Sequence, residues 1–388
     1  MARQRVFLHI GSPKTGTTFL QEVLWTNRDA LREAGVKYPG SRADAHFLAT
    51  QDLRELVWHG HVDPAVPGAW DRLVTEVRTW PGTSVISHEM LGSASPKAIK
   101  RALQSLAGLE VHIVLTTRDL ARQVPAVWQE DVKNCGLLTF GEFTRSLRGL
   151  DDSIDPFFAK TFWSYQDLPV VLRNWASDLP PERVHLITVP RRAARDELWT
   201  RFAAAVGIDA ARHPARVEVK NPSMGMVETT VVRRLNELTV GKLDWPAHQR
   251  YVKNFLAVDV LAGRPGSVPL RLPAEDQDWV LQKSKEMVQS LRDSAYDVIG
   301  DLDDLLPATD GAEARHPDDV SDGEVLDAAI YALAGLVHEL EAQRKRADEE
   351  RGLLAATLVP RPFRWAIDRY RDARVQLHEL KQSRFGPR

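Results

Sequence analysis

The sequence has 388 residues, of which 43% are hydrophobic, and it carries a formal net charge of −2 at pH 7. This length and composition fit one large globular domain with a smaller appendage. The charge balance argues against a general nucleic-acid binder, because no basic excess spreads over the chain to release counterions.

Strand-like and helix-like segments alternate along the chain. Short apolar runs typical of buried parallel strands are Arg5–Ile10, Thr83–Ser87, Val111–Thr117 and Arg183–Val189. A helix is predicted from Thr17 to Ala34, and another begins at Ser95–Pro96, with serine as cap and proline at the first helical position. The alternation predicts a three-layer α/β fold, with a central parallel sheet flanked by helices and a ligand site at the carboxyl ends of the strands.

The first predicted strand runs into the loop GSPKTGTT, residues 11–18. Gly11 and Gly16 keep the spacing of the nucleotide-hydrolase P-loop, but Thr17 stands where that motif has its lysine. Free backbone N–H groups and the dipole of the following helix favour a bound anion. The positive charge lies instead at Lys14, where an ammonium would sit over the phosphate nearest the reacting bond. This position suggests a phosphate as leaving group.

Polar segments also follow the second and third predicted strands. His88 and Glu89 come directly after Thr83–Ser87, and the segment TTRDLARQVPAVWQE, residues 116–130, begins as Val111–Thr117 ends. Because the carboxyl ends of parallel strands meet at one edge of a sheet, these segments and the glycine-flanked loop are expected to share a site.

Together these motifs resemble the family of sulfotransferases that use 3′-phosphoadenosine 5′-phosphosulfate, in its bacterial, P-loop-like form. PKTGTTFLQ is similar to that family's 5′-phosphosulfate loop, and TTRDLARQVPAVWQE is similar to its 3′-phosphate segment. The resemblance implies that Lys14 is the catalytic lysine and that Arg118 binds the 3′-phosphate. The 5′-phosphosulfate would be held by Lys14, Thr15, Gly16, Thr17 and Thr18. The family usually has a serine eight residues after the arginine, where this sequence has Ala126, so one hydrogen bond to the 3′-phosphate is missing or supplied elsewhere.

Sulfuryl transfer to an alcohol needs a base, since the attacking hydroxyl loses its proton. The family has a histidine or a glutamate in this region. Because side chains alternate along a strand, only one of His88 and Glu89 is expected to point into the site. We favour Glu89 as the base, with His88 as the alternative. No metal is expected, because a sulfuryl group carries less negative charge than a phosphoryl group and Lys14, N–H groups and a helix dipole can stabilise it.

Softer signals concern the acceptor and a late loop. Candidates to line the acceptor pocket are His46, Gln129 and Glu130. The segment KNPSMG, residues 220–225, precedes a helix; the resemblance implies that it closes over the nucleotide through Asn221 and Ser223, and a simple helix cap at Ser223 is the alternative. His59 and His61 in WHGHVD are interpreted as surface residues and not as metal ligands.

The sequence therefore predicts a sulfotransferase that moves a sulfuryl group from 3′-phosphoadenosine 5′-phosphosulfate to a hydroxyl of a small-molecule, lipid or saccharide acceptor. One alternative is a P-loop nucleotide kinase or hydrolase. Against it stand the missing lysine after Gly16 and the presence of Arg118 where a magnesium-binding aspartate would be looked for. A second alternative is a non-catalytic nucleotide-binding scaffold that acts through its tail.

The C-terminal part differs in character. The α/β domain is predicted over residues 1–306, followed by an acidic linker at 307–323 and a helical tail at 324–388. Apolar residues at heptad spacing, which indicate a short coiled coil that pairs two chains or docks on its own domain, are Leu326, Ile330, Leu333, Val337 and Leu340. Residues 351–388 hold nine Lys or Arg against three Asp or Glu, which favours contact with an anionic membrane surface, with a solvated helical tail as the alternative.

A cytoplasmic location is expected, with peripheral contact at the inner membrane face through the tail as an option. No apolar signal region precedes the first strand, and no apolar run approaches the length of a membrane span. The lone Cys135 cannot form an internal disulfide, which is typical of a reducing compartment.

Overall fold

The computed structural model describes residues 4–57, 60, 62–191, 195–217, 223–308 and 314–358. The chain divides into two compact units, residues 1–328 and 329–388, and the first contains the whole sheet. Residues 314–328 belong to the first unit, where Asp318 accepts hydrogen bonds from the backbone N–H groups of Phe140 and Gly141 at 2.9 and 2.8 Å. The predicted linker begins before this anchored segment, and its residues 309–313 lie outside the described residues.

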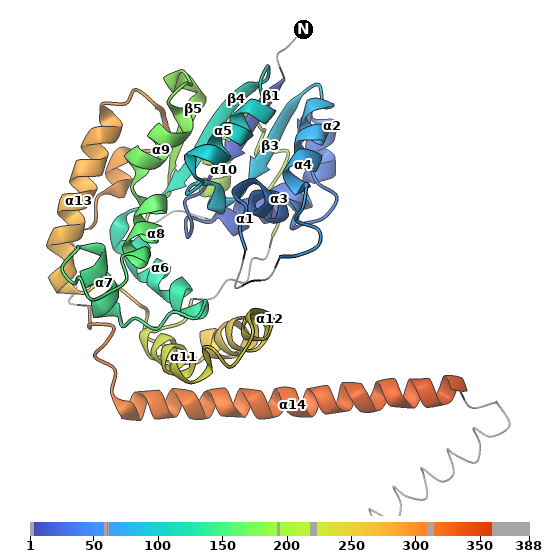
Figure 1. Ribbon diagram of the computed structural model, residues 1–388, viewed down its shortest axis with the longest axis vertical. Coiled ribbons are helices and arrows are strands. Elements are labelled where there is room, and N and C mark those ends of the chain that lie inside the picture. The colour runs from blue at the N-terminus through green and yellow to red at the C-terminus, as the bar shows by residue number, and fades with distance from the viewer. Residues whose placement is uncertain are drawn as a thin grey trace, which may run out of the picture. The chain divides into compact units, whose positions relative to one another are not determined.

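Six parallel strands form one sheet in the order β2-β3-β1-β4-β5-β6, and Figure 1 labels four of them, β3, β1, β4 and β5. Their bounds are β1 Arg5–His9, β2 Val36–Lys37, β3 Thr83–Ser87, β4 Glu110–Thr117, β5 Val184–Thr188 and β6 Asp297–Ile299. The four predicted strands are thus confirmed within about one residue at each end. The two edge strands have only two and three residues, too few for an alternating pattern. The molecule has the expected P-loop-like α/β fold.

Helices flank the sheet and extend beyond its carboxyl edge. The α-helices are α1 Thr17–Thr26, α2 Arg28–Glu33, α3 Ala45–Arg54, α4 Ala69–Arg78, α5 Pro96–Ser105, α6 Leu120–Lys133, α7 Phe140–Leu147, α8 Phe157–Gln166, α9 Leu168–Ala176, α10 Arg195–Val206, α11 Met226–Thr239, α12 Trp245–Ala247, α13 Ala274–Arg292 and α14 Asp322–Leu358. A π-helix, η3, spans His248–Val260, and short 3₁₀ turns are η1 Glu89–Leu91, η2 Pro181–Arg183, η4 Leu261–Gly263 and η5 Leu302–Leu305.

Two helix predictions are tested directly. The helix expected from Thr17 to Ala34 is interrupted at Asn27, whose side-chain amide donates to the Val23 carbonyl at 2.9 Å and to the Pro214 carbonyl at 3.3 Å. Asparagine side chains compete with helical backbone bonds in this way, so the prediction of one continuous helix was wrong. The start of α5 is confirmed, because the Ser95 hydroxyl caps it by accepting from the Ala98 N–H at 3.3 Å.

One face of the sheet is covered by α1, α2 and α10. Phe7 of β1 packs there with Leu24 of α1 and with Trp199 and Phe202 of α10, all at most 1% exposed. Because side chains alternate, Leu8 of β1 points to the opposite face, where it is fully buried. Burial on both faces explains why the strands read as nearly continuous apolar runs.

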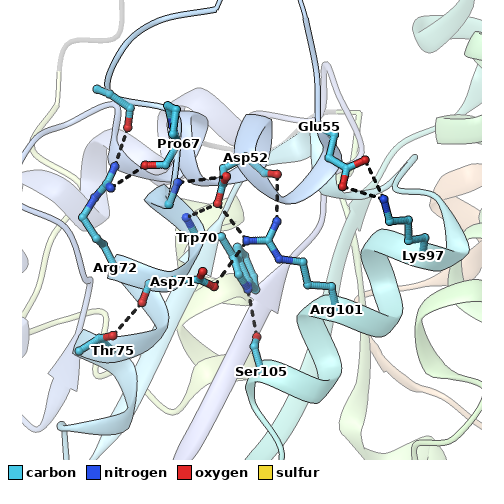
Figure 2. A network of polar contacts seen from close by, with 12 residues as sticks. Asp52, Glu55, Pro67, Trp70, Asp71, Arg72, Thr75, Lys97, Arg101 and Ser105 are labelled. Atoms are coloured by element: carbon cyan, nitrogen blue, oxygen red, sulfur yellow. Dashed lines mark hydrogen bonds and ion pairs between the residues drawn. The ribbon is translucent and has the colours of Figure 1, made fainter.

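A polar network links α3, α4 and α5 (Figure 2). The Asp52 carboxylate accepts from the Trp70 N–H in the first turn of α4 at 3.0 Å and pairs with Arg101 of α5 at 3.1 Å. The Trp70 indole N–H donates to the Ser105 hydroxyl at 3.0 Å. Two residues beyond Asp52, the Arg54 guanidinium donates to the Met90 carbonyl at 2.6 Å. The network therefore anchors the segment that follows β3.

Candidate active site

The loop between β1 and α1 has a backbone that needs its glycines. Gly11 and Gly16 have φ of 119° and 93°, and a Cβ on Gly16 would lie 2.5 Å from Leu198 Cδ2. Lys14 also has a positive φ, 63°, which is uncommon for a residue with a side chain and costs about 1 kcal/mol or more. The loop thus holds Lys14 in a left-handed backbone conformation.

The three threonines of the loop have different partners. The Thr15 hydroxyl donates to the Ser12 carbonyl at 2.6 Å and lies 2.6 Å from the Thr116 hydroxyl of β4, so it closes the loop onto the sheet. The buried Thr17 hydroxyl donates to Glu89. Thr18 is exposed at the start of α1, where the first N–H groups of a helix have no intrahelical acceptor. Of the three hydroxyls, that of Thr18 is therefore the one most open to an anion.

The loop follows a buried histidine, His9, which sequence reasoning missed. His9, the last residue of β1, hydrogen-bonds through Nδ1 with the Ser87 hydroxyl at 2.8 Å and through Nε2 with the Thr116 hydroxyl at 3.1 Å. It thereby ties the ends of β3, β1 and β4 together. Burial lowers the pKa of His9 to about 4, so the ring is neutral at pH 7. Its signal in the sequence is one polar residue in the otherwise apolar run VFLHI.

Glu89 faces the loop from the end of β3. Its carboxylate accepts from the Thr17 hydroxyl and, at 3.4 Å, from the Gln21 amide of α1. Burial by itself would raise the pKa of Glu89, but His88, a backbone N–H and the Thr17 hydroxyl stabilise the carboxylate and lower it. Glu89 is thus an ionised carboxylate beside the anion loop.

His88 is also buried, but its ring lies against Phe47 of α3, with the ring centroids 5.4 Å apart, whereas Glu89 contacts Thr17 and Gln21. Both residues lie just beyond the last residue of β3, so alternation within a strand does not by itself assign their directions. His88 Nδ1 accepts from the Met90 N–H at 3.2 Å, and burial lowers the pKa of the ring. The choice between Glu89 and His88 as base stays a prediction.

On the other side of the loop, Arg118 follows β4. Its Nε donates to Gln123 Oε1 at 2.5 Å and its Nη2 donates to the Arg122 carbonyl at 3.1 Å. The Gln123 amide donates in turn to the Pro13 carbonyl of the loop at 2.9 Å. Burial and the nearby Arg122 lower the pKa of Arg118 to about 10, so it remains charged at pH 7. Gln123, which was not predicted, therefore couples Arg118 to the loop.

Asp119, the residue after Arg118, is bonded to other residues of the protein. Its carboxylate is 1% exposed, accepts from the Arg122 N–H at 3.1 Å as the cap of α6, and pairs with the guanidinium of Arg122. Arg191 approaches the same carboxylate at 3.7 Å. Among the residues that the structure describes, no group of three His, Cys, Asp or Glu side chains is placed to hold a metal ion.

Lys14 reaches away from Arg118 to a cluster at the C-terminal end of α6. Its Nζ lies 2.7 Å from Glu130 Oε2, and Lys253 Nζ of η3 lies 2.9 Å from Glu130 Oε1. Lys133 Nζ approaches Oε2 at 3.8 Å, and the Asn134 amide donates to Oε1 at 3.3 Å. Burial opposes ionisation of Glu130, but Lys14, Lys253 and Lys133 hold its pKa well below the usual range. Lys133 and Lys253 were not predicted, and no local pattern marks them.

The other predicted acceptor residues lie in the scaffold. His46 Nε2 donates to the Pro39 carbonyl at 2.7 Å and its Nδ1 accepts from the Ser87 N–H at 3.0 Å, so both ring nitrogens bond to backbone. The buried Gln129 amide donates to the Met224 carbonyl at 2.7 Å. Gln129 thus fixes the segment before α11, and neither residue joins the cluster around Lys14.

The late loop is described only in part. Asn221 lies outside the described residues, as do His59 and His61. Ser223 is exposed, and α11 begins at Met226 with Gly225 as its N-cap and with no side-chain cap. The alternative of Ser223 as a helix cap was therefore wrong, because the helix begins three residues after it. Its contact with a nucleotide stays a prediction.

The predicted tail is helical as far as the structure describes it. α14 runs from Asp322 to Leu358, and the heptad residues of this helix are between 55% and 62% exposed. Pairing of two chains through them stays a prediction, and residues 359–388, which hold most of the basic segment, lie outside the described residues. No helix in the described ranges combines the length and apolar composition needed to cross a membrane.

No family model and no curated protein matches the sequence. Among solved structures, the chain is similar to the crystal structure of a sulfotransferase from Alicyclobacillus acidocaldarius, at 16% sequence identity and a TM-score of 0.38. The match covers 64% of this chain and 100% of that one. Since a TM-score below 0.5 does not establish a shared fold, the function has to be argued from the residues of this chain.

Proposed function

We propose that this protein transfers a sulfuryl group from 3′-phosphoadenosine 5′-phosphosulfate to a hydroxyl of an acceptor. The observation that carries the proposal is the order of three neighbouring strands, β3-β1-β4. Their carboxyl ends bring Glu89, the anion loop with Lys14, and Arg118 to one edge of the sheet. Glu89 is hydrogen-bonded to Thr17 of the loop, and Arg118 is connected to the loop through Gln123. This arrangement supports a site with a base, an anion-binding loop that carries a cation, and a second cation for the 3′-phosphate.

Each group has a defined task in such a transfer. Exposed N–H groups at the start of α1 and the Thr18 hydroxyl would bind the 5′-phosphosulfate, and Arg118 would bind the 3′-phosphate. Lys14 would stabilise negative charge on the phosphate oxygen as its bond to sulfur breaks. Glu89 would accept the proton of the acceptor hydroxyl as the new oxygen–sulfur bond forms.

The kinase or hydrolase alternative has less support from the site. A nucleotide hydrolase places a lysine and a magnesium-binding hydroxyl at the first turn after the glycines, and here Thr17 directs its hydroxyl to Glu89. The aspartate nearest the end of β4, Asp119, is bonded to arginine and to the start of α6. Neither residue is placed as a magnesium ligand.

Ligand-dependent melting separates the candidates. Adenosine 3′,5′-bisphosphate should raise the melting temperature far more than ATP with magnesium, because a ligand at 100 times its dissociation constant adds about 2.7 kcal/mol to the stability of the folded state. Arg118→Ala should remove most of that shift, whereas Arg212→Ala, at an arginine whose side chain is 83% exposed, should keep it. Equal stabilisation by ATP would favour the kinase. Binding without sulfate transfer to any alcohol would favour the non-catalytic scaffold.

A further inference from the structure

The cluster around Glu130 carries more positive charge than its own carboxylate balances. Three ammonium groups, from Lys14, Lys133 and Lys253, surround one carboxylate, which leaves a surplus of two positive charges. The lysines come from three separate elements: the loop after β1, α6 and η3. Since like charges repel, such a group is favourable chiefly when an anion completes it.

Lys133 is the least satisfied member. Its side chain is only 4% exposed, its closest carboxylate oxygen is 3.8 Å away, and no hydrogen bond to its ammonium is found among the described residues. Burial, together with the neighbouring Lys14, lowers the pKa of Lys133 to about 8. A position at the end of α6 explains one lysine through the helix dipole, but not the approach of Lys253 from another element.

The place of the cluster relative to the proposed donor indicates what the anion belongs to. Arg118 and Arg122 lie at the start of α6, and Glu130 and Lys133 lie at its end, about 12 to 17 Å beyond Arg122 along the helix axis. The donor would extend from Arg118 to the loop, where Lys14 marks the bond that breaks. Because Lys14 of the donor loop contacts Glu130 at 2.7 Å, the cluster adjoins the point where the donor bond would break, and an anion bound there would belong to the molecule that approaches that bond.

We propose that Lys133 and Lys253, with Glu130 between them, bind an oxyanion carried by the acceptor, so that the preferred acceptor is a hydroxyl compound that also bears a phosphate, sulfate or carboxylate group. The acceptor assignment rests on the proposed sulfotransferase function. The oxyanion site itself rests only on the cluster. In this arrangement Glu130 holds the two lysines apart and in place, and the incoming oxyanion supplies the hydrogen-bond acceptor that Lys133 lacks.

The test is calorimetric titration of the full chain with inorganic pyrophosphate, a small polyanion, while adenosine 3′,5′-bisphosphate saturates the nucleotide site. We expect pyrophosphate to bind, and expect Lys133→Met and Lys253→Met each to weaken it about tenfold or more, as for loss of a charge-assisted hydrogen bond. Both variants should bind the bisphosphate within about twofold of the parent chain, because they lie away from Arg118. Lys242→Met, at an exposed lysine outside the cluster, is the matched control.

Three outcomes would overturn the proposal. Pyrophosphate does not bind beside the nucleotide, or it binds equally well to both lysine variants. In the third, the variants bind 3′-phosphoadenosine 5′-phosphosulfate more weakly but bind the bisphosphate as the parent chain does. This result would mean that the lysines hold the sulfuryl group of the donor. Lys253→Met, at a side chain that is 24% exposed, keeps the test decisive if Lys133→Met does not fold. A chain that binds pyrophosphate through these lysines but does not bind the bisphosphate would refute the sulfotransferase proposal and leave the oxyanion site standing.

Discussion

The two ends of α6 both carry clusters of charge, but they are organised in opposite ways. At the N-terminal end, the buried carboxylate of Asp119 pairs with Arg122 and is approached by Arg191, and Gln123 holds Arg118. At the C-terminal end, three lysines share the single carboxylate of Glu130. The first end holds one arginine in a fixed orientation by internal bonds, whereas the second keeps charge that the protein does not neutralise. One helix can thus carry a rigid anion contact at its N-terminal end and an incomplete one at its C-terminal end.

Glu89 lies at neither end of α6, and its removal should have the largest effect. Glu89→Gln keeps the shape of the side chain but cannot accept a proton, so sulfate transfer should fall about 10²- to 10⁴-fold. Affinity for adenosine 3′,5′-bisphosphate should stay nearly unchanged, because both phosphate contacts remain. The measurement is transfer from a labelled donor, with donor hydrolysis by water as the readout while the acceptor is unidentified.

His88→Ala is the matched control for Glu89→Gln. Its loss should be mild, since burial lowers the pKa of the ring and its Nδ1 accepts a hydrogen bond from the backbone N–H of Met90. If His88→Ala is inactive and Glu89→Gln is active, the base assignment is wrong, while the loop and Arg118 keep their roles.

Lys14 connects the donor loop to the C-terminal end of α6, because its ammonium contacts Glu130. Lys14→Ala should lower turnover about 10²- to 10³-fold, because the ammonium stabilises charge that develops only as the donor bond breaks. Bisphosphate affinity should fall much less. A parent-like rate in Lys14→Ala would show that the lysine only completes the Glu130 cluster, and the C-terminal end of α6 would then have to be interpreted without the donor.

The sequence predicted the parts of the fold and site that depend on local patterns. Buried strands, the glycine-flanked loop and the Ser95 cap follow from short-range chemistry, and the parallel sheet places Glu89, Lys14 and Arg118 at one edge. β2 and β6 escaped prediction because they have two and three residues and depend on neighbouring strands.

The unpredicted site residues depend on contacts between distant segments. Lys253 meets Glu130 across more than a hundred residues of sequence, through packing of η3 against α6. Gln123 stood inside the predicted 3′-phosphate segment, but only its contact with the Pro13 carbonyl reveals what it does. Sequence patterns report which chemistry follows each strand, and tertiary packing decides which of these side chains remain open to a ligand.

The smallest effect expected concerns Asp131, next to Glu130 but on a different side of α6. Adjacent helical residues point about 100° apart, so Asp131 does not share the lysines. One of its carboxylate oxygens is enclosed without a partner, and burial raises its pKa from 3.8 to about 6. A carboxyl whose folded pKa is raised destabilises the folded state once it ionises, so this penalty grows as pH rises from about 4 to above 6. The C-terminal end of α6 therefore contains one acid that the lysines stabilise and one that they do not.

Asp131→Asn should remove that penalty. At pH 7.5 the variant should exceed the parent chain in free energy of unfolding by about 1–3 kcal/mol, from a shift of about two units at 1.36 kcal/mol each, reduced for partial exposure. At pH 3 the two should be nearly equal, because the parent carboxyl is then largely protonated in both the folded and the unfolded state. Denaturant titrations at the two pH values measure the difference, and Asp178→Asn, at an exposed aspartate, should show no such pH dependence. A gain that does not vary with pH, or a loss at pH 7.5, would mean that the Asp131 carboxylate is already stabilised by the lysine cluster, and the contrast between neighbouring acids on α6 would not hold.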